Sequence, residues 1–347
     1  MTDTLTKPGF TARDLVVGVD IGGSKVAVLV AGPDGSPVGR YTLEQPVGGQ
    51  DAALEVIADA IGVALADAGA AMPSIAAVGI GVPGRVDPEA GTVSLAVNLG
   101  WEALQLGPLL ASRLGTIVVL ENDVRAAAYG LHQRRVLGDV DDLAYLSVGT
   151  GISAGVILDG RLHRGTRGLA GEIGHIALER DGPLCPCGLR GCFEALAAGP
   201  AIARTAHELL AAGRESSLRP LGEAISAVDV YSAAIAGDPV AAEIATRVGE
   251  HVARAVHELV MAYDIEVVVL GGGVSKAGDA FLDPILRALD RMRDASALAR
   301  EVLRPGVVHL LPATSETGAR GGVAIAQAAL AGTWPSAVLP PDEIVEG

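Results

Sequence analysis

Three cysteines and one histidine form the densest group of chemically reactive residues in the chain. They follow the pattern His175, nine residues, then Cys185-x-Cys187-x4-Cys192, and these are the only three cysteines present. Three thiolates and an imidazole are a ligand set that Zn²⁺ takes in a closed tetrahedral site. A disulfide would leave one thiol over, and two cysteines one residue apart are poorly placed to bridge each other. The spacing therefore predicts a structural zinc ion, with uncoordinated buried thiols as the alternative.

Glycine turns that follow apolar strands form a second group of chemically informative residues. The stretch 15–30 is predicted to be a hairpin with a polar tip, and the stretch 143–164 repeats this pattern. A third apolar strand, 265–270, ends in a glycine triplet before a helix that begins at Asp279. Glycines allow a backbone to approach a ligand closely, although ordinary glycine hairpins are an alternative for each turn. The turn residues are Asp20, Gly22, Gly23, Ser24 and Lys25; Gly149, Thr150 and Gly151; and Gly271, Gly272 and Gly273.

Two further strands are predicted to end in polar or tightly turned segments. The strand 75–82 leads into a turn at Pro83-Gly84, a position where α/β sheets place ligands. The strand 116–120 leads into Asn122-Asp123, and the helix 124–137 follows. An aspartate at this point is also a common N-cap, so its role is open from spacing alone.

The motifs together resemble those of the ROK family (repressors, open reading frames and sugar kinases). The family pattern Glu-x-Gly-His followed by Cys-x-Cys-Gly-x-x-Gly-Cys-x-Glu is complete here, from Glu172 to His175 and from Cys185 to Glu194. Five motifs occur in family order between about residues 15 and 330. The resemblance implies a metal that fixes the loop carrying Glu172, His175 and Glu194 onto sugar hydroxyls. A histidine suits both tasks, because one ring nitrogen can bind a metal while the other donates to a ligand.

The resemblance also implies roles for the other motifs. Asp123 would accept the proton of the attacking sugar hydroxyl, and Asn122 would hold the neighbouring hydroxyls, while Gly84 and Asn98 would line the sugar. The turns at 20–25 and 149–151 would face the phosphates of ATP, with Mg²⁺ near Asp20, and the turn at 271–273 would hold the adenosine. Trp101, close to Asn98, is expected to be a packing anchor.

The chain departs from the family pattern at three places. Ser24 replaces a common threonine but keeps the hydroxyl group. Val124-Arg125 follows Asp123 where the family usually has Ala-Asn, which affects the expected substrate preference and not the base. Ile152-Ser153-Ala154-Gly155 replaces a common Leu-Gly-Gly-Gly, which leaves less room near the predicted phosphate turn.

The repeated hairpin predicts the fold. Two copies of a strand-turn-strand-turn-strand unit resemble the ribonuclease-H-like halves of the actin, hexokinase and Hsp70 ATPases, with a cleft between two α/β domains. We expect a flexible tail over 1–14, an N-terminal domain over 15–122 completed by the helix 315–330, and a larger domain over 123–314 containing the zinc loop 175–192. A last strand is expected over 302–311, and the segment beyond Trp334 is expected to be loose.

Composition limits the partners of the protein. The 347 residues carry 41 acidic and 26 basic side chains, a formal net charge of −15. Nucleic acid is therefore not an expected partner, because binding it needs a basic face. No stretch approaches the roughly 20 apolar residues of a membrane span, so a cytoplasmic protein with no membrane partner is expected. The family implies a homodimer or a higher homo-oligomer.

The sequence thus predicts ATP-dependent phosphorylation of the primary hydroxyl, normally O6, of a hexose. Glucose is the first choice of acceptor. An N-acetylhexosamine, glucosamine or a C7-cyclitol has the same hydroxyl pattern, and polyphosphate is an alternative donor. A sugar-responsive repressor is disfavoured by the short N-terminal segment and the acidic charge. A noncatalytic sugar-binding relative is the remaining alternative.

Overall fold

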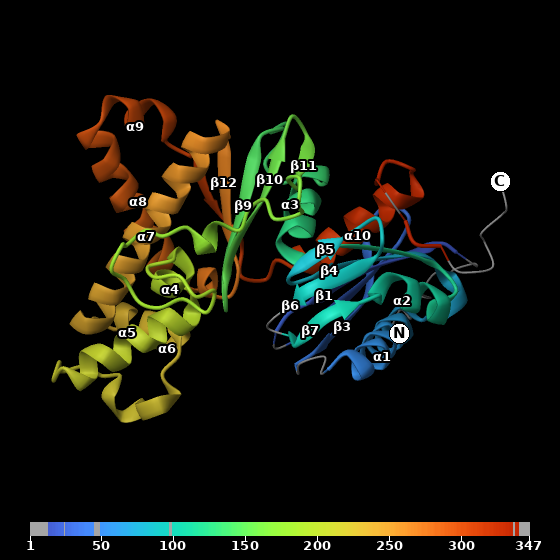
Figure 1. The fold of residues 1–347 in the computed structure, drawn as a ribbon, viewed down its shortest axis with the longest axis horizontal. Coiled ribbons are helices and arrows are strands. Elements are labelled where there is room, and N and C mark those ends of the chain that lie inside the picture. The colour runs from blue at the N-terminus through green and yellow to red at the C-terminus, as the bar shows by residue number, and fades with distance from the viewer. Residues whose placement is uncertain (1–12, 24, 45–48, 97–98, 336, 340–347) are drawn as a thin grey trace, which may run out of the picture. The chain divides into compact units, whose positions relative to one another are not determined.

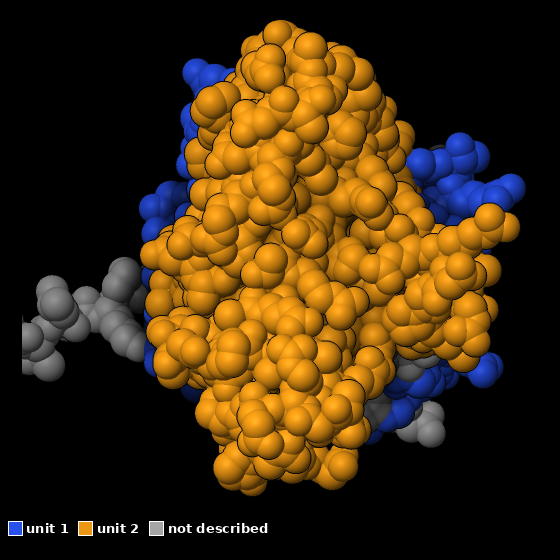
Figure 2. Space-filling model, turned by 90° about the vertical axis from the view of Figure 1, so that its left-hand side faces the viewer, with its two compact units in different colours: residues 1–139, 164–169, 316–347 blue, residues 140–163, 170–315 orange. Residues whose placement is uncertain are grey.

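The protein folds into two compact units, each built around a five-stranded sheet (Figure 1). The computed structural model describes residues 13–23, 25–44, 49–96, 99–335 and 337–339. Unit 1 comprises residues 1–139, 164–169 and 316–347, and unit 2 comprises residues 140–163 and 170–315; Figure 2 colours them separately. The predicted boundary after residue 122 falls inside unit 1, because the following helix belongs to this unit.

The sheet of unit 1 has the strand order β3-β2-β1-β4-β8. The first three strands form an antiparallel meander, whereas β4 and β8 run parallel to β1. The strands are rich in valine and isoleucine, which suit a pleated and buried surface. Their bounds are Leu15–Ile21 (β1), Val26–Ala31 (β2), Pro37–Leu43 (β3), Ile75–Val82 (β4) and Ile117–Asn122 (β8).

Helices cover both faces of this sheet. Val28 and Val30 of β2 belong to the core formed with α1 (Gln50–Ala68), while Leu29 and Ala31 pack against α10 (Thr317–Leu330). Successive side chains of a strand point to opposite faces, so the two helices lie on opposite sides of the sheet. The other helices of unit 1 that lie wholly within the described residues are η1 (Met72–Ser74), α2 (Leu106–Leu114) and α3 (Asp123–Gln133).

Glycines allow α10 to pack very closely against its neighbours. A Cβ atom on Gly18 of β1 would lie 2.0 Å from the carbonyl oxygen of Ala319, and one on Gly79 of β4 would lie 2.0 Å from that of Gly322. A Cβ atom on Gly130 of α3 would lie 2.8 Å from the Cα atom of Gly321. The last helix therefore fits directly onto two strands and one helix that occur far earlier in the chain.

A small antiparallel sheet of β5 (Arg85–Asp87), β6 (Thr92–Ala96) and β7 (Trp101–Leu104) extends unit 1. Its strands were not predicted, because they are too short to display an alternating pattern. Trp101 is 1% exposed and belongs to the core of unit 1, the position expected of a packing anchor.

Unit 2 repeats the topology of unit 1. Its strand order is β11-β10-β9-β12-β13, again an antiparallel meander followed by two strands parallel to the first. This duplication confirms the predicted two-domain α/β fold of the actin and hexokinase type. The bounds are Leu143–Val148 (β9), Ile152–Leu158 (β10), Arg161–His163 (β11), Val267–Gly271 (β12) and Val308–Leu310 (β13).

Polar side chains cap two of the helices in unit 2. Asp238 caps the longest helix, α7, by accepting hydrogen bonds from the backbone N–H groups of Val240 and Ala241, both at 3.0 Å. Ser226 and Asp229 form a capping box at the start of α6. The helices are η3 (Ile173–His175), α4 (Phe193–Ala197), α5 (Gly199–Ala211), η4 (Arg219–Ala224), α6 (Ala227–Ile235), α7 (Pro239–Tyr263), η5 (Val274–Ala277), α8 (Asp279–Ala295) and α9 (Ala297–Val302).

Two expectations about the end of the chain were wrong. The predicted strand over 302–311 is reduced to β13, because α9 ends at Val302 and the backbone turns at Gly306 with φ of 87°. The segment beyond Trp334 is not entirely loose, since Val338 pairs with Val118 of β8 through two backbone hydrogen bonds of 3.0 and 3.1 Å. Among the described residues, none of the helices combines the length and apolar character needed to cross a lipid bilayer.

Candidate active site and metal cluster

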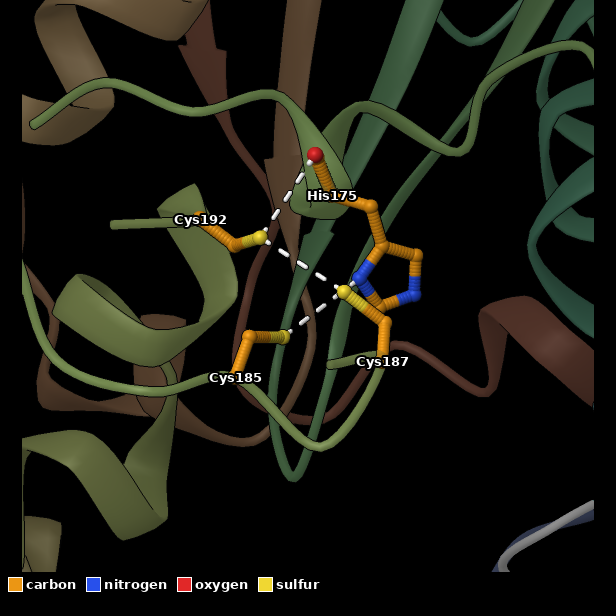
Figure 3. A group of neighbouring side chains, drawn as sticks. All are labelled: His175, Cys185, Cys187 and Cys192. Atoms are coloured by element: carbon orange, nitrogen blue, oxygen red, sulfur yellow. Dashed lines mark hydrogen bonds between the residues drawn. The ribbon is translucent and has the colours of Figure 1, made fainter. Parts of the chain in front are cut away.

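His175 and the three cysteines, all within the described residues, converge at one point of unit 2 (Figure 3). One ligand atom from each of the four residues lies within 4.8 Å of the others. The three thiols are free and gather on one side of the imidazole. Nδ1 of His175 faces the Cys185 sulfur at 3.7 Å, and the other ring nitrogen points away from the thiols. The ring therefore keeps a nitrogen available for a second partner.

The spacing of these atoms fits a tetrahedral zinc ion. Zinc bonds of about 2.3 Å to sulfur and 2.0 Å to nitrogen place neighbouring ligands about 3.5–3.8 Å apart. The sulfurs of Cys187 and Cys192 are 3.7 Å apart, like the Cys185 and His175 atoms. A disulfide would bring two sulfurs to about 2.05 Å. The predicted ligands therefore have the separation that a shared metal requires.

Backbone hydrogen bonds pre-form the cysteine loop. The N–H of Cys185 donates to the carbonyl of Leu189 at 2.8 Å, and the N–H of Gly188 donates back to Cys185 at 2.9 Å. Gly191 must be glycine, because φ is 68° and a Cβ atom would lie 1.5 Å from the Glu179 carbonyl oxygen. Burial raises the pKa of the Cys192 thiol to about 12. A buried thiolate here needs a compensating positive charge, which a metal cation would supply.

The segment that precedes His175 lies directly against β10. Gly171 and Gly174 pack so tightly that Cβ atoms on them would lie 1.7 Å from the Ala154 carbonyl oxygen and 2.1 Å from that of Ile152. The N–H of Ala154 and the hydroxyl of Ser153 both donate to the carbonyl of Gly171, at 2.8 and 3.2 Å. Ser153 and Ala154, which depart from the family pattern, thus hold the start of the loop that carries Glu172. The Ala154 side chain lies in the core of unit 2.

Glu194 connects the metal loop to the glycine turn at 149–151. It lies in α4, two residues after Cys192, and its Oε2 atom accepts a hydrogen bond from the N–H of Ile152 at 2.9 Å. A Cβ atom on Gly151 would lie 2.7 Å from the same oxygen, so glycine makes room for the carboxylate. Within unit 2, a predicted sugar ligand and a predicted phosphate turn are therefore in direct contact.

The third glycine turn lies beside the second. β9 and β12 are neighbouring parallel strands, so their carboxyl ends are at the same edge of the sheet. Gly272 has φ of 92°, and a Cβ atom there would lie 2.4 Å from the Val148 carbonyl oxygen. The N–H of Gly199, at the start of α5, donates to the carbonyl of Gly149 at 2.8 Å. Two strand ends and a helix N-terminus, the kind of site that binds phosphate, thus meet in unit 2.

In unit 1, Asp20 lies at the tip of β1 before a tight turn. The N–H of Gly22 donates to the carbonyl of Lys25 at 2.8 Å and closes the turn to β2. Gly318, in the first turn of α10, packs so closely that a Cβ atom would lie 2.2 Å from the Asp20 carboxylate. Burial raises the pKa of Asp20 to about 6, and the charge of Lys25 opposes this shift. Ser24 lies outside the described residues.

Asn122, and not Asp123, is the N-cap of α3. Its Oδ1 atom accepts from the backbone N–H groups of Val124 and Arg125, both at 3.1 Å, and its Nδ2 donates to the carbonyl of Gly84 at 3.4 Å. Asp123 is the first residue of the helix, and a Cβ atom on Gly81 would lie 3.1 Å from its Cα atom. The cap therefore fixes the backbone that presents Asp123.

Gly84 lies in a turn whose conformation and neighbours require a glycine. Its φ is 95°, and a Cβ atom would lie 2.8 Å from the Cα atom of Ala96. The predicted turn between β4 and β5 is thus held against β6 on one side and Asn122 on the other. Asn98, its predicted partner in lining a sugar, lies outside the described residues.

A buried ion cluster between the end of β8 and the start of α3 was not predicted. Glu121 is 0% exposed, and its two oxygens accept from Nε of Arg125 at 2.8 Å and from Nε of Arg164 at 2.6 Å. Arg125 also donates to the carbonyl of Gly168 at 2.8 Å, and the Arg164 guanidinium lies 4.5 Å from the ring centroid of Trp334. Arg125, which departs from the family pattern, was the available signal. Its partner Glu121 is four residues away, but Arg164 and Gly168 each lie 43 residues beyond the residue that they contact.

The site residues are divided between the two units. Unit 1 holds Asp20 with its glycine turn, and brings together Gly84, Asn122 and Asp123. Unit 2 brings together the cysteine cluster with His175, the loop of Glu172, Glu194, and the glycine turns at 149–151 and 271–273.

Known proteins resemble this chain over most of its length. The model of the ROK family matches residues 16–330. The glucokinase of Halalkalibacterium halodurans is 32% identical over 292 residues, which are 81% of this chain and 88% of that protein. An N-acetylmannosamine kinase of Vibrio cholerae is 31% identical over 301 residues, 86% of this chain and 93% of that protein.

A solved structure resembles the fold as well. The ROK family glucokinase from Streptomyces griseus in complex with glucose and AMPPNP aligns with a TM-score of 0.77 and 32% identity, over 90% of this chain and 99% of that one. The family model, the relatives and the duplicated fold agree with the motifs described above. The chain belongs to the ROK family.

Proposed function

We propose that this protein transfers the terminal phosphoryl group of ATP to the primary hydroxyl of a hexose, with glucose as the first choice of acceptor. The broader assignment, a sugar kinase of the ROK family, follows from the family membership and from glucokinase relatives that match over about four fifths of the chain. The proposal goes beyond that assignment by naming the acceptor and the donor. The observation that supports a sugar acceptor is the contact of the metal loop with the glycine turn at 149–151 in unit 2.

The acceptor residues are held by the metal loop and by β10. The Cys3His cluster would bind Zn²⁺, whose part is structural and whose charge fixes the orientation of the His175 ring. Nδ1 faces the cluster, so Nε2 can donate to a sugar hydroxyl. Glu172 begins this loop and Glu194 follows its last cysteine, so both carboxylates depend on the same fixed segment. Each can accept hydrogen bonds from sugar hydroxyls.

Asp123 would be the catalytic base. It is the first residue of α3, and the Asn122 cap holds the backbone that carries its carboxylate. Removal of the hydroxyl proton by a positioned carboxylate contributes roughly 10²–10⁴-fold to the rate. The proposal requires Asp123 of unit 1 and the acceptor residues of unit 2 to contact the same sugar.

The glycine turns would bind ATP. Their backbone N–H groups can hold phosphates without basic side chains, which suits a chain with a net charge of −15. We propose that the phosphates contact 149–151 and the turn after Asp20, and that the adenosine lies against 271–273. Mg²⁺ would neutralise phosphate charge, and Asp20 is the candidate carboxylate for its coordination sphere. AMPPNP in the Streptomyces griseus glucokinase complex supports ATP as the donor.

Other acceptors remain alternatives. The N-acetylmannosamine kinase relative of Vibrio cholerae supports an N-acetylhexosamine as the second choice. Asn122 is engaged by the cap of α3 and by Gly84, so fewer of its hydrogen-bonding groups are left for sugar hydroxyls than the family pattern implies. The homodimer and the cytoplasmic location remain predictions.

An acceptor panel tests the proposal. The purified protein is incubated with Mg-ATP and glucose, N-acetylmannosamine, N-acetylglucosamine, glucosamine or a C7-cyclitol, and both ADP and the phosphorylated product are quantified. We expect equal amounts of ADP and glucose 6-phosphate, with a larger kcat/KM for glucose than for the other acceptors. A larger value for an amino sugar would replace glucose as the acceptor, and ADP without any phosphorylated sugar would refute the kinase.

A further inference from the structure

A cavity of about 510 Å³ lies in unit 1, among residues that the proposed reaction does not use. The end of α3, one side of α10 and the turn between β2 and β3 form its walls. This volume is in the range of small-molecule sites. Arg134 and Arg320 both line it.

The two arginines gather positive charge in an otherwise acidic protein. Arg134 is the residue that ends α3, and Arg320 lies in the first turns of α10. Burial and the nearby charge of Arg320 both lower the pKa of Arg134, which means that the two guanidinium groups repel each other. Two like charges held beside one cavity cost stability unless an anion neutralises them.

Nearby carboxylates compensate this charge only in part. Glu316 pairs with Arg320 at 3.4 Å, but it is shared with Arg40 at 3.6 Å. Asp34 also lines the cavity, and its carboxylate accepts from the backbone and the hydroxyl of Ser36 at 3.0 and 2.6 Å. Within the part of the chain that the structure describes, Arg134 forms no ion pair. The charged side chains of the lining thus sum to one excess positive charge.

The rest of the lining suits an organic body with hydroxyl groups. Gln133 and Gln327 line it with amides, and Tyr129 and Thr333 with hydroxyls. The Gln327 amide and the Thr333 hydroxyl donate to backbone carbonyls and retain acceptor capacity for a ligand. Val323 and the alanines of α10 supply an apolar wall. A cavity of this size exceeds what an inorganic ion alone fills.

We propose that this cavity is a binding site for a small phosphate ester, held by Arg134 and Arg320. Two planar guanidinium groups can each donate two hydrogen bonds to one phosphate group, a geometry that lysine or a single arginine does not provide. The polar lining contacts the hydroxyls of the ester, and the wall of α10 covers its carbon atoms. The site does not depend on the proposed kinase reaction, because it uses none of its residues.

Calorimetric titration tests the site. Glucose 6-phosphate, inorganic phosphate and glucose are titrated separately into the protein in the presence of saturating glucose and AMPPNP, which occupy the proposed kinase site. We expect glucose 6-phosphate to bind more tightly than inorganic phosphate, and glucose to give no additional binding. Tighter binding of inorganic phosphate would identify the free ion as the ligand and overturn the ester.

Matched variants separate this cavity from any other anion site. Arg134→Gln and Arg320→Gln are expected to weaken binding by about ten- to a hundredfold, the effect of losing hydrogen bonds to a charged partner. Arg135→Gln is the control, because Arg135 is the next residue, is exposed and pairs with Asp139 outside the cavity. Equal affinities in the Arg134→Gln variant and the wild type would overturn the proposal.

Thermal unfolding without ligand distinguishes a binding role from a structural role. Arg134→Gln removes one of two repelling charges, so its Tm is expected to equal or exceed that of the wild type. Over saturating glucose and AMPPNP, added glucose 6-phosphate should raise the Tm of the wild type and of Arg135→Gln, but not that of Arg134→Gln. A lower Tm of unliganded Arg134→Gln, together with unchanged ligand stabilisation, would show that Arg134 only supports the fold.

Discussion

Arg125→Met is expected to destabilise unit 1 by about 3 kcal/mol. Arg125 is 2% exposed, and its guanidinium group donates to the buried carboxylate of Glu121 and to the carbonyl of Gly168, both at 2.8 Å. Breaking a buried ion pair typically costs about 3–5 kcal/mol, because the remaining charge stays buried. Glu121 retains Arg164 at 2.6 Å, and methionine fills part of the volume. Both features place the expected cost at the lower end of that range.

Tryptophan fluorescence in a urea titration measures this loss in unit 1. The chain has two tryptophans, Trp101 and Trp334, and both lie in unit 1. With an m value of about 2 kcal/mol per M, a loss of about 3 kcal/mol lowers the midpoint by about 1.5 M urea. Arg135→Met is the matched control, because its exposed pair with Asp139 contributes at most about 1 kcal/mol. Equal midpoints for the two variants would refute a stabilising role for the buried cluster.

Three further changes test the site. Asp123→Ala should lower kcat by about 10²–10⁴-fold with glucose affinity by calorimetry preserved, and unchanged turnover would exclude it as the base. Cys187→Ala, at an exposed ligand, should lower zinc content by metal analysis and weaken glucose binding together, so intact affinity in a metal-free sample would contradict the coupling. Burial raises the pKa of Asp20 from the ordinary value of 3.8 to about 6 in the folded protein. Ionisation of Asp20 therefore lowers the free energy of unfolding; this loss is complete above pH 6 and absent below pH 3.8. Asp20→Asn should therefore increase the free energy of unfolding by up to about 3 kcal/mol at pH 8 and change it little at pH 4 in urea titrations, while a pH-independent difference would contradict the shift.

The fold was predictable because its strongest signals are local. The hairpins at 15–30 and 143–164 show apolar strands separated by glycines, and their repetition indicated the duplicated topology. Neighbouring cysteines likewise predicted the metal cluster, since Cys185, Cys187 and Cys192 lie within eight residues. The roles of the individual sugar and nucleotide ligands remain predictions.

The features that were missed depend on contacts between distant residues. α3 packs against α10, which is about 190 residues later in the chain, so no local pattern could assign α3 to unit 1. The same is true of the Arg164 contact with Glu121 and of the pairing of Val338 with Val118. Local propensity indicates where a helix begins, but not which distant element packs against it.

The dependence of unit 1 on α10 has a consequence for biosynthesis. When residues 1–139 have emerged from the ribosome, every strand of the five-stranded sheet of unit 1 has been synthesised. The helix that packs onto Gly18 and Gly79 has not. Unit 2 consists of residues 140–163 and 170–315, so its whole sequence emerges before α10 is complete. The nascent chain therefore carries an uncovered sheet face until residues 317–330 have been synthesised, and termination before residue 317 leaves that face exposed to chaperones and proteases.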